Sequence, residues 1–311
     1  KVYTDVRNVR PIALFYDNVS AAAPQSGISK ADILIEVMVE GGISRLIAIT
    51  NDYGADTDVF GPIRSARHYM VELSSAFGAL MVGAGYSDQG YAAIKNNGLN
   101  YINGVHDRYA GTWFFRDPER VNNFGYTHSL MITAKGIGKM AQINGFPTTL
   151  ATIPQNFNYV EEGKDVALGG GLSTHIIMSY SSYQQVQFIY SSSTGTYYRY
   201  QFGDKAHLDA ENGQQLNFNN IFVLFTQSQK IAGDSEGRLD VETTGSGTGY
   251  YITGGRYAEI KWYRNTDTGA FIFTTPEGLI LTVERGTSFI AMVDQTLKGT
   301  SAIDLNFKLA G

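Results

Sequence analysis

The sequence predicts an α+β protein in which an N-terminal mixed α/β part packs against a β-rich C-terminal part of hairpins and meanders. In the first half, strand-like apolar runs alternate with segments of helical period. From about residue 160, short strand-like runs follow one another at regular intervals. The 311 residues include 20 Tyr and 17 Phe but only 17% charged residues, a balance that favours β structure.

The N-terminal part opens with an apolar run and a hairpin. The run "RPIALFYDN" (10–18) begins after Pro11 and closes on Asp17 and Asn18, which predicts a buried strand ending in a turn. The runs "DILIEVMVE" (32–40) and "ISRLIAITN" (43–51) flank a Gly-Gly pair. This pattern predicts two strands paired as a hairpin.

Helical signals follow. Apolar residues recur at helical spacing over 68–77, and the run 79–82 then predicts a strand that ends in glycine. Ser87 is placed to cap a short helix that ends before Gly98. A further helix is predicted over about 133–144, where Gly145 and Pro147 stop it.

The C-terminal part consists of short predicted strands separated by glycine-containing turns. We therefore divide the chain into an N-terminal domain of residues 1–155 and a C-terminal domain of residues 156–311, closely docked. The segment "GSGTG" (245–249) lacks both the Lys-Ser/Thr pair and the following helix of a phosphate loop. It therefore predicts a turn or bulge.

Composition excludes several classes of function. A formal net charge of -5 argues against nonspecific electrostatic binding to nucleic acid or anionic lipid. Any anion site must therefore be local and made by converging arginines. The absence of cysteine excludes disulfides, cysteine-zinc sites and a thiol nucleophile. The five histidines are scattered, so we expect no metal and no cofactor. No apolar run reaches the roughly 18 residues that span a bilayer.

The segment "GPIRSAR" (61–67) sets two arginines three positions apart behind a Gly-Pro turn. If Arg64 and Arg67 lie in one helical turn, their side chains share a face. Near a helix start they need a compensating negative charge. That charge is either an internal carboxylate or a bound anion, and both alternatives stay open. The candidate carboxylates are those of Glu36, Glu40 and Glu72.

A second arginine-bearing segment is "WFFRDPERVNNFGYTHS" (113–129), in which Arg116 and Arg120 follow three aromatic residues and precede His128. Aromatic side chains beside arginines can frame a pocket for an anionic or sugar-bearing ligand. The alternative is an ordinary loop with internal Arg–Asp pairs. Asp17 and Asn18, at a predicted strand end, are either turn-forming residues or part of the same pocket.

Several of these blocks, in their order along the chain, resemble the YerB-like family of bacterial lipoproteins. The blocks of the first half are "RPIALFYDN", "PQSGISKADILIEVMVEGGISRLIAI", "GPIRSAR", "FFRD" and "HSLMIT". Those of the second half are "YYRYQFGDKAHLDAENGQQLNFNNIFVLF", "GRLDVETTGSGTGYYITGGRYAEIKW" and "TPEGLILTVERGTSFIAMV". The likeness covers nearly the whole chain.

The resemblance implies an extracytoplasmic lipoprotein of a Gram-positive-type bacterium, held at the membrane by an acylated cysteine upstream of Lys1. It also implies two closely packed α+β parts, and it implies no activity. The family's Arg-Ser-Ala-Arg block matches Arg64 to Arg67, and its aromatic-Trp-Arg-Asp block matches Phe114 to Asp117, with Phe115 where tryptophan is usual. After His128-Ser129-Leu130 the usual Tyr-Thr is replaced by Met131-Ile132-Thr133, which puts any role of that tyrosine in doubt.

Three functions are compatible with these observations, and a binding module is favoured over a protein–protein scaffold and over an enzyme. In the first, a cleft holds an anionic envelope ligand. In the second, exposed strand edges or aromatic residues recruit a protein partner. In the third, arginines stabilise charge on a phosphate-bearing substrate, with Asp17, Glu40 or His128 as base. The predicted ligand-binding residues are Arg64, Arg67, Arg116, Arg120, His128, Asp17, Asn18 and Glu40.

Overall fold

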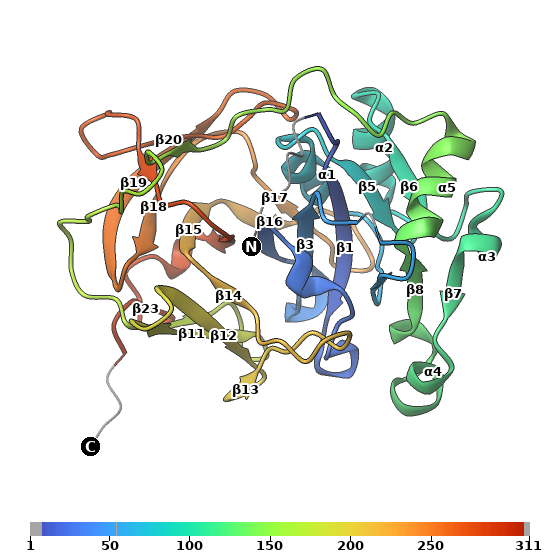
Figure 1. The fold of residues 1–311 in the computed structure, drawn as a ribbon, viewed down its shortest axis with the longest axis horizontal. Helices are drawn as coiled ribbons and strands as arrows, with labels where there is room; N and C mark the ends of the chain where they lie inside the picture. The colour runs from blue at the N-terminus through green and yellow to red at the C-terminus, as the bar shows by residue number, and fades with distance from the viewer. Residues whose placement is uncertain (1–7, 54, 308–311) are drawn as a thin grey trace.

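A ten-stranded mixed sheet forms the centre of the protein (Figure 1). The computed structural model describes residues 8–53 and 55–307. In spatial order, the strands of the sheet are β20 (Ile272–Thr274), β19 (Arg256–Arg264), β18 (Gly245–Thr253), β15 (Asn220–Thr226), β22 (Ser288–Asp294), β2 (Ile33–Met38), β3 (Ser44–Thr50), β1 (Ile12–Asn18), β5 (Leu80–Gly83) and β6 (Tyr101–Asn103).

The central sheet crosses the predicted domain division. Its strands β1, β2, β3, β5 and β6 come from the first half of the chain, and β15, β18, β19, β20 and β22 come from the second. They meet where β22 pairs in parallel with β2 on one side and with β15 on the other. Whether 1–155 and 156–311 are separate folding units stays a prediction, but strands from both ranges share one hydrogen-bonded sheet.

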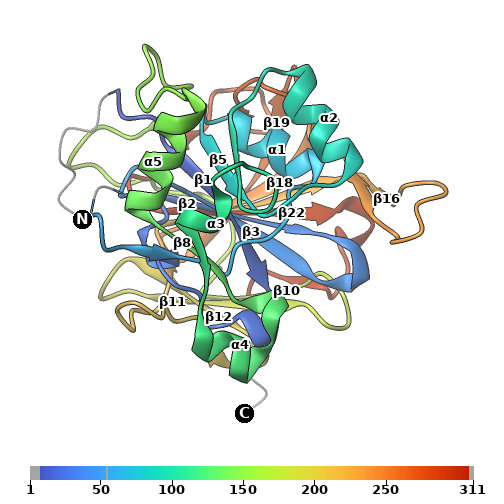
Figure 2. The same ribbon diagram turned by 90° about the vertical axis from the view of Figure 1, so that its right-hand side faces the viewer.

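A smaller sheet covers one face of the central sheet, and helices cover part of the other (Figure 2). Its strands are β13 (Lys205–Ala206), β12 (Thr196–Gln201), β11 (Gln185–Ser191), β10 (His175–Ser179) and β23 (Ile303–Asp304), and β14 (Asn217–Phe218) pairs with β12. Helices α1 (His68–Ser75) and α2 (Asp88–Asn96) pack on that other face, whereas α3 (Ala110–Trp113) and α5 (Ala134–Asn144) join the core on the side of the smaller sheet; the remaining helix is α4 (Pro118–Phe124).

Three smaller sheets complete the strands, and short 3-10 turns link the elements. The first sheet is β4 (Val59–Phe60), β8 (Leu130–Thr133) and β7 (Phe114–Arg116). The others pair β16 (Ser228–Lys230) with β17 (Leu239–Val241), and β21 (Thr282–Val283) with β9 (Asn158–Tyr159). The 3-10 turns are η1 (Ser20–Ala22), η2 (Ile28–Lys30), η3 (Glu40–Gly42), η4 (Tyr126–His128) and η5 (Gln295–Leu297).

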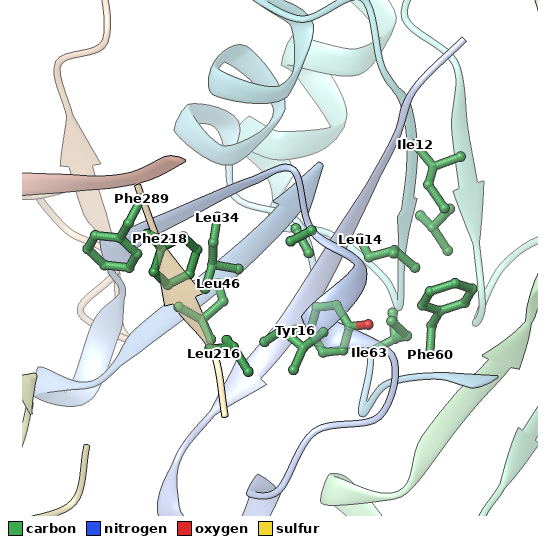
Figure 3. Close-up of a cluster of buried hydrophobic side chains, with 14 of the residues drawn as sticks. Ile12, Leu14, Tyr16, Leu34, Leu46, Phe60, Ile63, Leu216, Phe218 and Phe289 are labelled. Carbon is green, nitrogen blue, oxygen red and sulfur yellow. The ribbon is translucent and has the colours of Figure 1, made fainter. Parts of the chain in front are cut away.

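Strand β1 is buried on both faces, which explains its continuous apolar run. Its side chains alternate between the two sides of the sheet, as the strand period of two requires. Leu14 and Tyr16 enter the core on the side of the smaller sheet, and Phe15 enters the core beneath α1. Figure 3 shows the core on the side of the smaller sheet, in which Leu34 and Leu46 lie beside Phe218 and Phe289.

The structure confirms the α+β class and most of the predicted elements. The strand before Asp17, the hairpin β2–β3, helix α1 and the strands of the second half all form. The Ser87 side chain accepts a hydrogen bond from the Gly90 amide and caps α2, and Gly145 ends α5 in a left-handed conformation.

One condition considered for the arginines does not hold, and one local prediction was wrong. Residues 61–66 are not helical, because their backbone groups bond to neighbouring strands: Ile63 donates to Leu130 and Arg64 to Phe15, and α1 begins only at His68. Arg64 and Arg67 therefore do not share a helical face. The "GSGTG" segment is not a turn but the first half of β18.

Candidate functional site at the end of β1

Asp17 and Asn18 end β1, and they point to opposite faces of the central sheet because they are adjacent in a strand. Asp17 contacts the "GPIRSAR" loop and His128. Asn18 lies on the other face, where it donates to Glu36 (3.1 Å) and to Ser44 (2.8 Å). The two neighbours, predicted for one pocket, thus belong to two separate polar clusters.

The Asp17 carboxylate, with a side chain only 2% exposed, holds His128 and Arg64 together. Its Oδ2 atom lies 2.7 Å from His128 Nδ1 and 3.4 Å from Arg64 Nε. Within the described residues, the second imidazole nitrogen of His128 makes no hydrogen bond, and about a quarter of the side chain is exposed (24%). The carboxylate therefore fixes the orientation of an imidazole that still has one nitrogen available.

Arg64 and Arg116 both reach the short turn η4 that carries His128. Arg64 Nη1 donates to the Thr127 carbonyl (3.2 Å), and Arg116 Nη1 donates to the adjacent Tyr126 carbonyl (2.7 Å). The Arg116 guanidinium also stacks 4.0 Å above the Tyr126 ring. We call Asp17, Arg64, Arg116 and His128 the Asp17 cluster; it contains two guanidinium groups and one carboxylate.

Arg67 lies in a different environment, paired with Glu40. Its Nε donates to Glu40 Oε2 (3.0 Å), its Nη2 contacts Oε1, and Arg45 Nη2 lies 3.7 Å from the same carboxylate. Burial alone would raise the pKa of Glu40, but the hydrogen bond from Arg67 and the charge of Arg45 lower it overall. Of the two alternatives for Arg67, the internal carboxylate holds.

Sequence reasoning missed Arg45, because the pairing of β1 with β3 leaves no local pattern in the sequence. Arg45 lies directly opposite Asp17 in the β1–β3 ladder, so the two side chains point to the same face. Its Nη1 donates to the Ser65 carbonyl (2.5 Å). Burial, followed by the nearby charge of Arg67, lowers the pKa of Arg45 to about 10, so Arg45 stays charged at neutral pH.

Arg120 is buried and bonds to backbone carbonyls rather than to a carboxylate. Asp117 caps α4 by accepting from the Arg120 backbone amide, and the Arg120 side chain reaches η1. There the guanidinium donates to the Ala22 carbonyl (2.9 Å) and to that of Pro24. Arg120 thus joins α4 to the loop after β1.

The second polar cluster, on the Asn18 side, joins the two sheets and was not anticipated. Glu36 of β2 and Arg199 of β12 form an ion pair at 2.7 Å with both side chains fully buried. Ser44 and Gln184 also donate to Glu36, at 2.6 and 3.0 Å. These hydrogen bonds offset the cost of removing the charges from water.

His207 belongs to this second cluster, and its contacts define its charge. Arg199 Nη1, which can only donate, contacts His207 Nδ1, so that nitrogen must accept. His207 Nε2 lies 2.8 Å from the Gln25 Oε1 acceptor and therefore carries the proton. Burial and the Arg199 charge lower the pKa of His207 well below its ordinary value, consistent with a neutral imidazole.

The structure thus brings together four of the eight predicted site residues and separates the others. Asp17, Arg64, Arg116 and His128 meet at η4, Arg67 pairs with Glu40, and Arg120 and Asn18 serve internal contacts. Whether any of them binds a ligand stays a prediction.

Within residues 8–53 and 55–307, no cluster of three or more histidine, aspartate or glutamate side chains is arranged to hold a metal ion. In the same residues, no helix is long and apolar enough to cross a membrane.

Comparison with known families identifies the class of this protein. Residues 2–147 match the N-terminal domain, and residues 176–290 the C-terminal domain, of the family described as protein of unknown function DUF3048. The chain belongs to this family.

A curated protein and a solved structure that are similar to this chain both come from Bacillus subtilis. The chain is 29% identical over 269 residues to "Putative lipoprotein YerB" of strain 168, covering 84% of this chain and 75% of that protein. The crystal structure of the YerB protein from Bacillus subtilis has a TM-score of 0.78 and 26% identity, with 98% of this chain and 96% of that chain covered. The resemblance stated from the sequence is confirmed.

Proposed function

We propose that this protein is a membrane-anchored, extracytoplasmic binding module that holds an anionic group of a cell-envelope ligand at the Asp17 cluster. The observation that carries the proposal is the convergence of Arg64, Arg116 and His128 on the turn η4. The membrane-anchored location rests on the likeness to "Putative lipoprotein YerB".

The unused donors of the cluster support an anion as the ligand. Arg64 and Arg116 each donate from one Nη atom to a backbone carbonyl. Because a guanidinium carries five N–H donors, each has further donors for a ligand. In the described part of the chain, no carboxylate forms an ion pair with Arg116. A phosphate or carboxylate group could accept from both guanidinium forks, and from His128 when both of its ring nitrogens carry protons; charge-assisted hydrogen bonds of this kind are the strong ones.

Four other predicted residues hold the ligand-contacting side chains and their loops in place. Asp17 orients His128, the Arg67–Glu40 pair anchors the end of the "GPIRSAR" loop, and Arg120 holds α4. We therefore assign ligand contact to Arg64, Arg116 and His128, and a positioning role to Asp17, Glu40, Arg67 and Arg120.

Calorimetric titration with pyrophosphate at low ionic strength tests the proposal. Replacing both arginines (Arg64→Gln with Arg116→Gln) should weaken pyrophosphate binding at least about tenfold, because each lost charge-assisted hydrogen bond contributes about 1.5–3 kcal/mol. Arg285→Gln is the matched control, since it removes an exposed arginine that donates to the Val160 carbonyl, away from the cluster.

Equal loss of affinity in Arg285→Gln would mean that only net charge matters and would overturn the proposal. So would the absence of pyrophosphate binding to the wild-type protein. Release of phosphate from p-nitrophenyl phosphate that is abolished by His128→Gln would instead support an enzyme.

A further inference from the structure

A cavity of about 440 Å³ lies beside the hairpin β18–β19, well away from the Asp17 cluster. In Figure 1 β18, β19 and β23 lie at the left of the molecule, and β8 and α4 at the right. The residues that line the cavity include Leu172, Tyr250, Tyr257, Ser301, Asp304 and Asn306. Its volume is within the range of about 300–1,000 Å³ that small-molecule sites occupy.

Two tyrosines form aromatic walls of this cavity at a right angle. The rings of Tyr250 and Tyr257 are 5.7 Å apart at 89°. Both side chains are half-buried on the sheet face that looks towards the smaller sheet, so part of each ring remains open. Burial, followed by the charge of Glu259, raises the pKa of Tyr250, and its hydroxyl is therefore a hydrogen-bond donor at neutral pH.

The segment around β23 adds polar residues to the lining. These are Ser301, Asp304 and Asn306, which alternate with the apolar Ile303 and Leu305. Asp304 Oδ1 accepts from the Asn306 backbone amide (2.9 Å), which fixes the carboxylate in place. Within the described residues, Asp304 Oδ2 makes no hydrogen bond, so it can accept from a ligand.

We propose that this cavity binds a neutral saccharide. A sugar ring has an apolar face of C–H groups that packs on tyrosine rings, and hydroxyl groups at its rim that pair with carboxylate, amide and hydroxyl side chains. The cavity presents both kinds of surface at once. Asp304 in its wall and Glu259 opposite Tyr250 in the β18–β19 ladder disfavour phosphorylated or acidic sugars.

This site is independent of the proposed anion site, because the two share no residue. A failure of either leaves the other standing.

Saturation-transfer NMR with maltotriose, cellotriose and chitotriose, each in the millimolar range, tests the saccharide site. At least one trisaccharide should receive saturation from the protein. Leu172→Trp should weaken its binding at least about tenfold, because the larger ring fills the cavity mouth. Leu172 is 57% exposed, so this change leaves the core intact. Ile272→Trp is the matched control: it adds the same ring at a 44% exposed position on β20, outside the cavity.

A second variant distinguishes the ligand class. Asp304→Asn should weaken trisaccharide binding while the protein unfolds at the same temperature as the wild type. The wild-type protein could instead bind tetramethylammonium but no trisaccharide, and Asp304→Asn could abolish that binding. This result would overturn the proposal in favour of an ammonium site. Trisaccharide binding that persists in Leu172→Trp, or no binding to the wild-type protein, would also overturn it.

Discussion

At the residue scale, the partner of each charged side chain follows from the face of the strand on which it lies. Asp17 and Asn18 are neighbours in the chain, yet one contacts Arg64 and His128 and the other contacts Glu36. The alternation of side chains along a strand is sufficient to separate them. The partners themselves were not readable from the sequence, because they come from segments far apart in the chain, such as the two that meet in the Asp17–His128 contact.

The Arg67–Glu40 pair gives a pH-dependent prediction. Glu40→Gln should lower the free energy of unfolding by about 1–3 kcal/mol at pH 7, because it removes one partner of a mostly buried ion pair. The pKa of Glu40 is lowered in the folded protein. Its contribution is therefore complete above the ordinary carboxyl pKa and is lost as the pH falls through the folded value.

Urea denaturation at several pH values measures this. The difference between wild type and Glu40→Gln should shrink as the pH falls below about 4. Glu162→Gln, at an exposed position, should change stability little at any pH. A difference that stayed constant with pH would contradict the ion pair.

At the element scale, local pattern predicted strands and helices well and failed where backbone groups pair over long distances. The Gly-Pro turn before Arg64 looked like a helix start, but residues 61–66 bond to β1 and β8 instead. The glycines of "GSGTG" looked like turn residues. They are strand residues whose missing side chains let β18 approach Trp262 and β15.

Gly247→Ala tests this account of β18. A Cβ atom at Gly247 would lie 2.4 Å from Trp262 Nε1 and 2.7 Å from the Phe225 carbonyl oxygen, so the substitution should destabilise the protein by about 1–3 kcal/mol. Gly138→Ala in α5 is the control, because nothing lies within 4 Å of its added Cβ. It should stabilise by about 0.5–1 kcal/mol. Equal thermal shifts in the two variants would refute the packing explanation.

At the scale of the whole molecule, the central sheet and the Glu36–Arg199 pair join the two halves of the chain. Strand β22 lies between β2 and β15 and hydrogen bonds to both. Sequence reasoning anticipated two docked parts, since the change from a mixed α/β pattern to strands alone is visible near residue 160. A shared sheet leaves no trace in local periodicity.

This architecture predicts that neither half folds alone. Residues 1–155 without β22 would expose the edge of β2 and the apolar face over Leu34 and Leu46. We expect no cooperative thermal transition for 1–155 or for 156–311, and recovery of one when the two are co-expressed. A cooperative transition of 1–155 by itself, followed by circular dichroism, would favour the two-domain division instead.

The α+β class, most of the strands and helices, the family and the segments that hold the candidate site could all be predicted from the amino-acid sequence. These depend on local periodicity, capping residues and ordered motifs, which are properties of neighbours in the chain. Three features required the three-dimensional arrangement: Arg67 faces Glu40, Arg64 and Arg116 meet at η4, and one sheet spans both halves. Those choices depend on burial and strand order, which bring together residues that no local pattern connects.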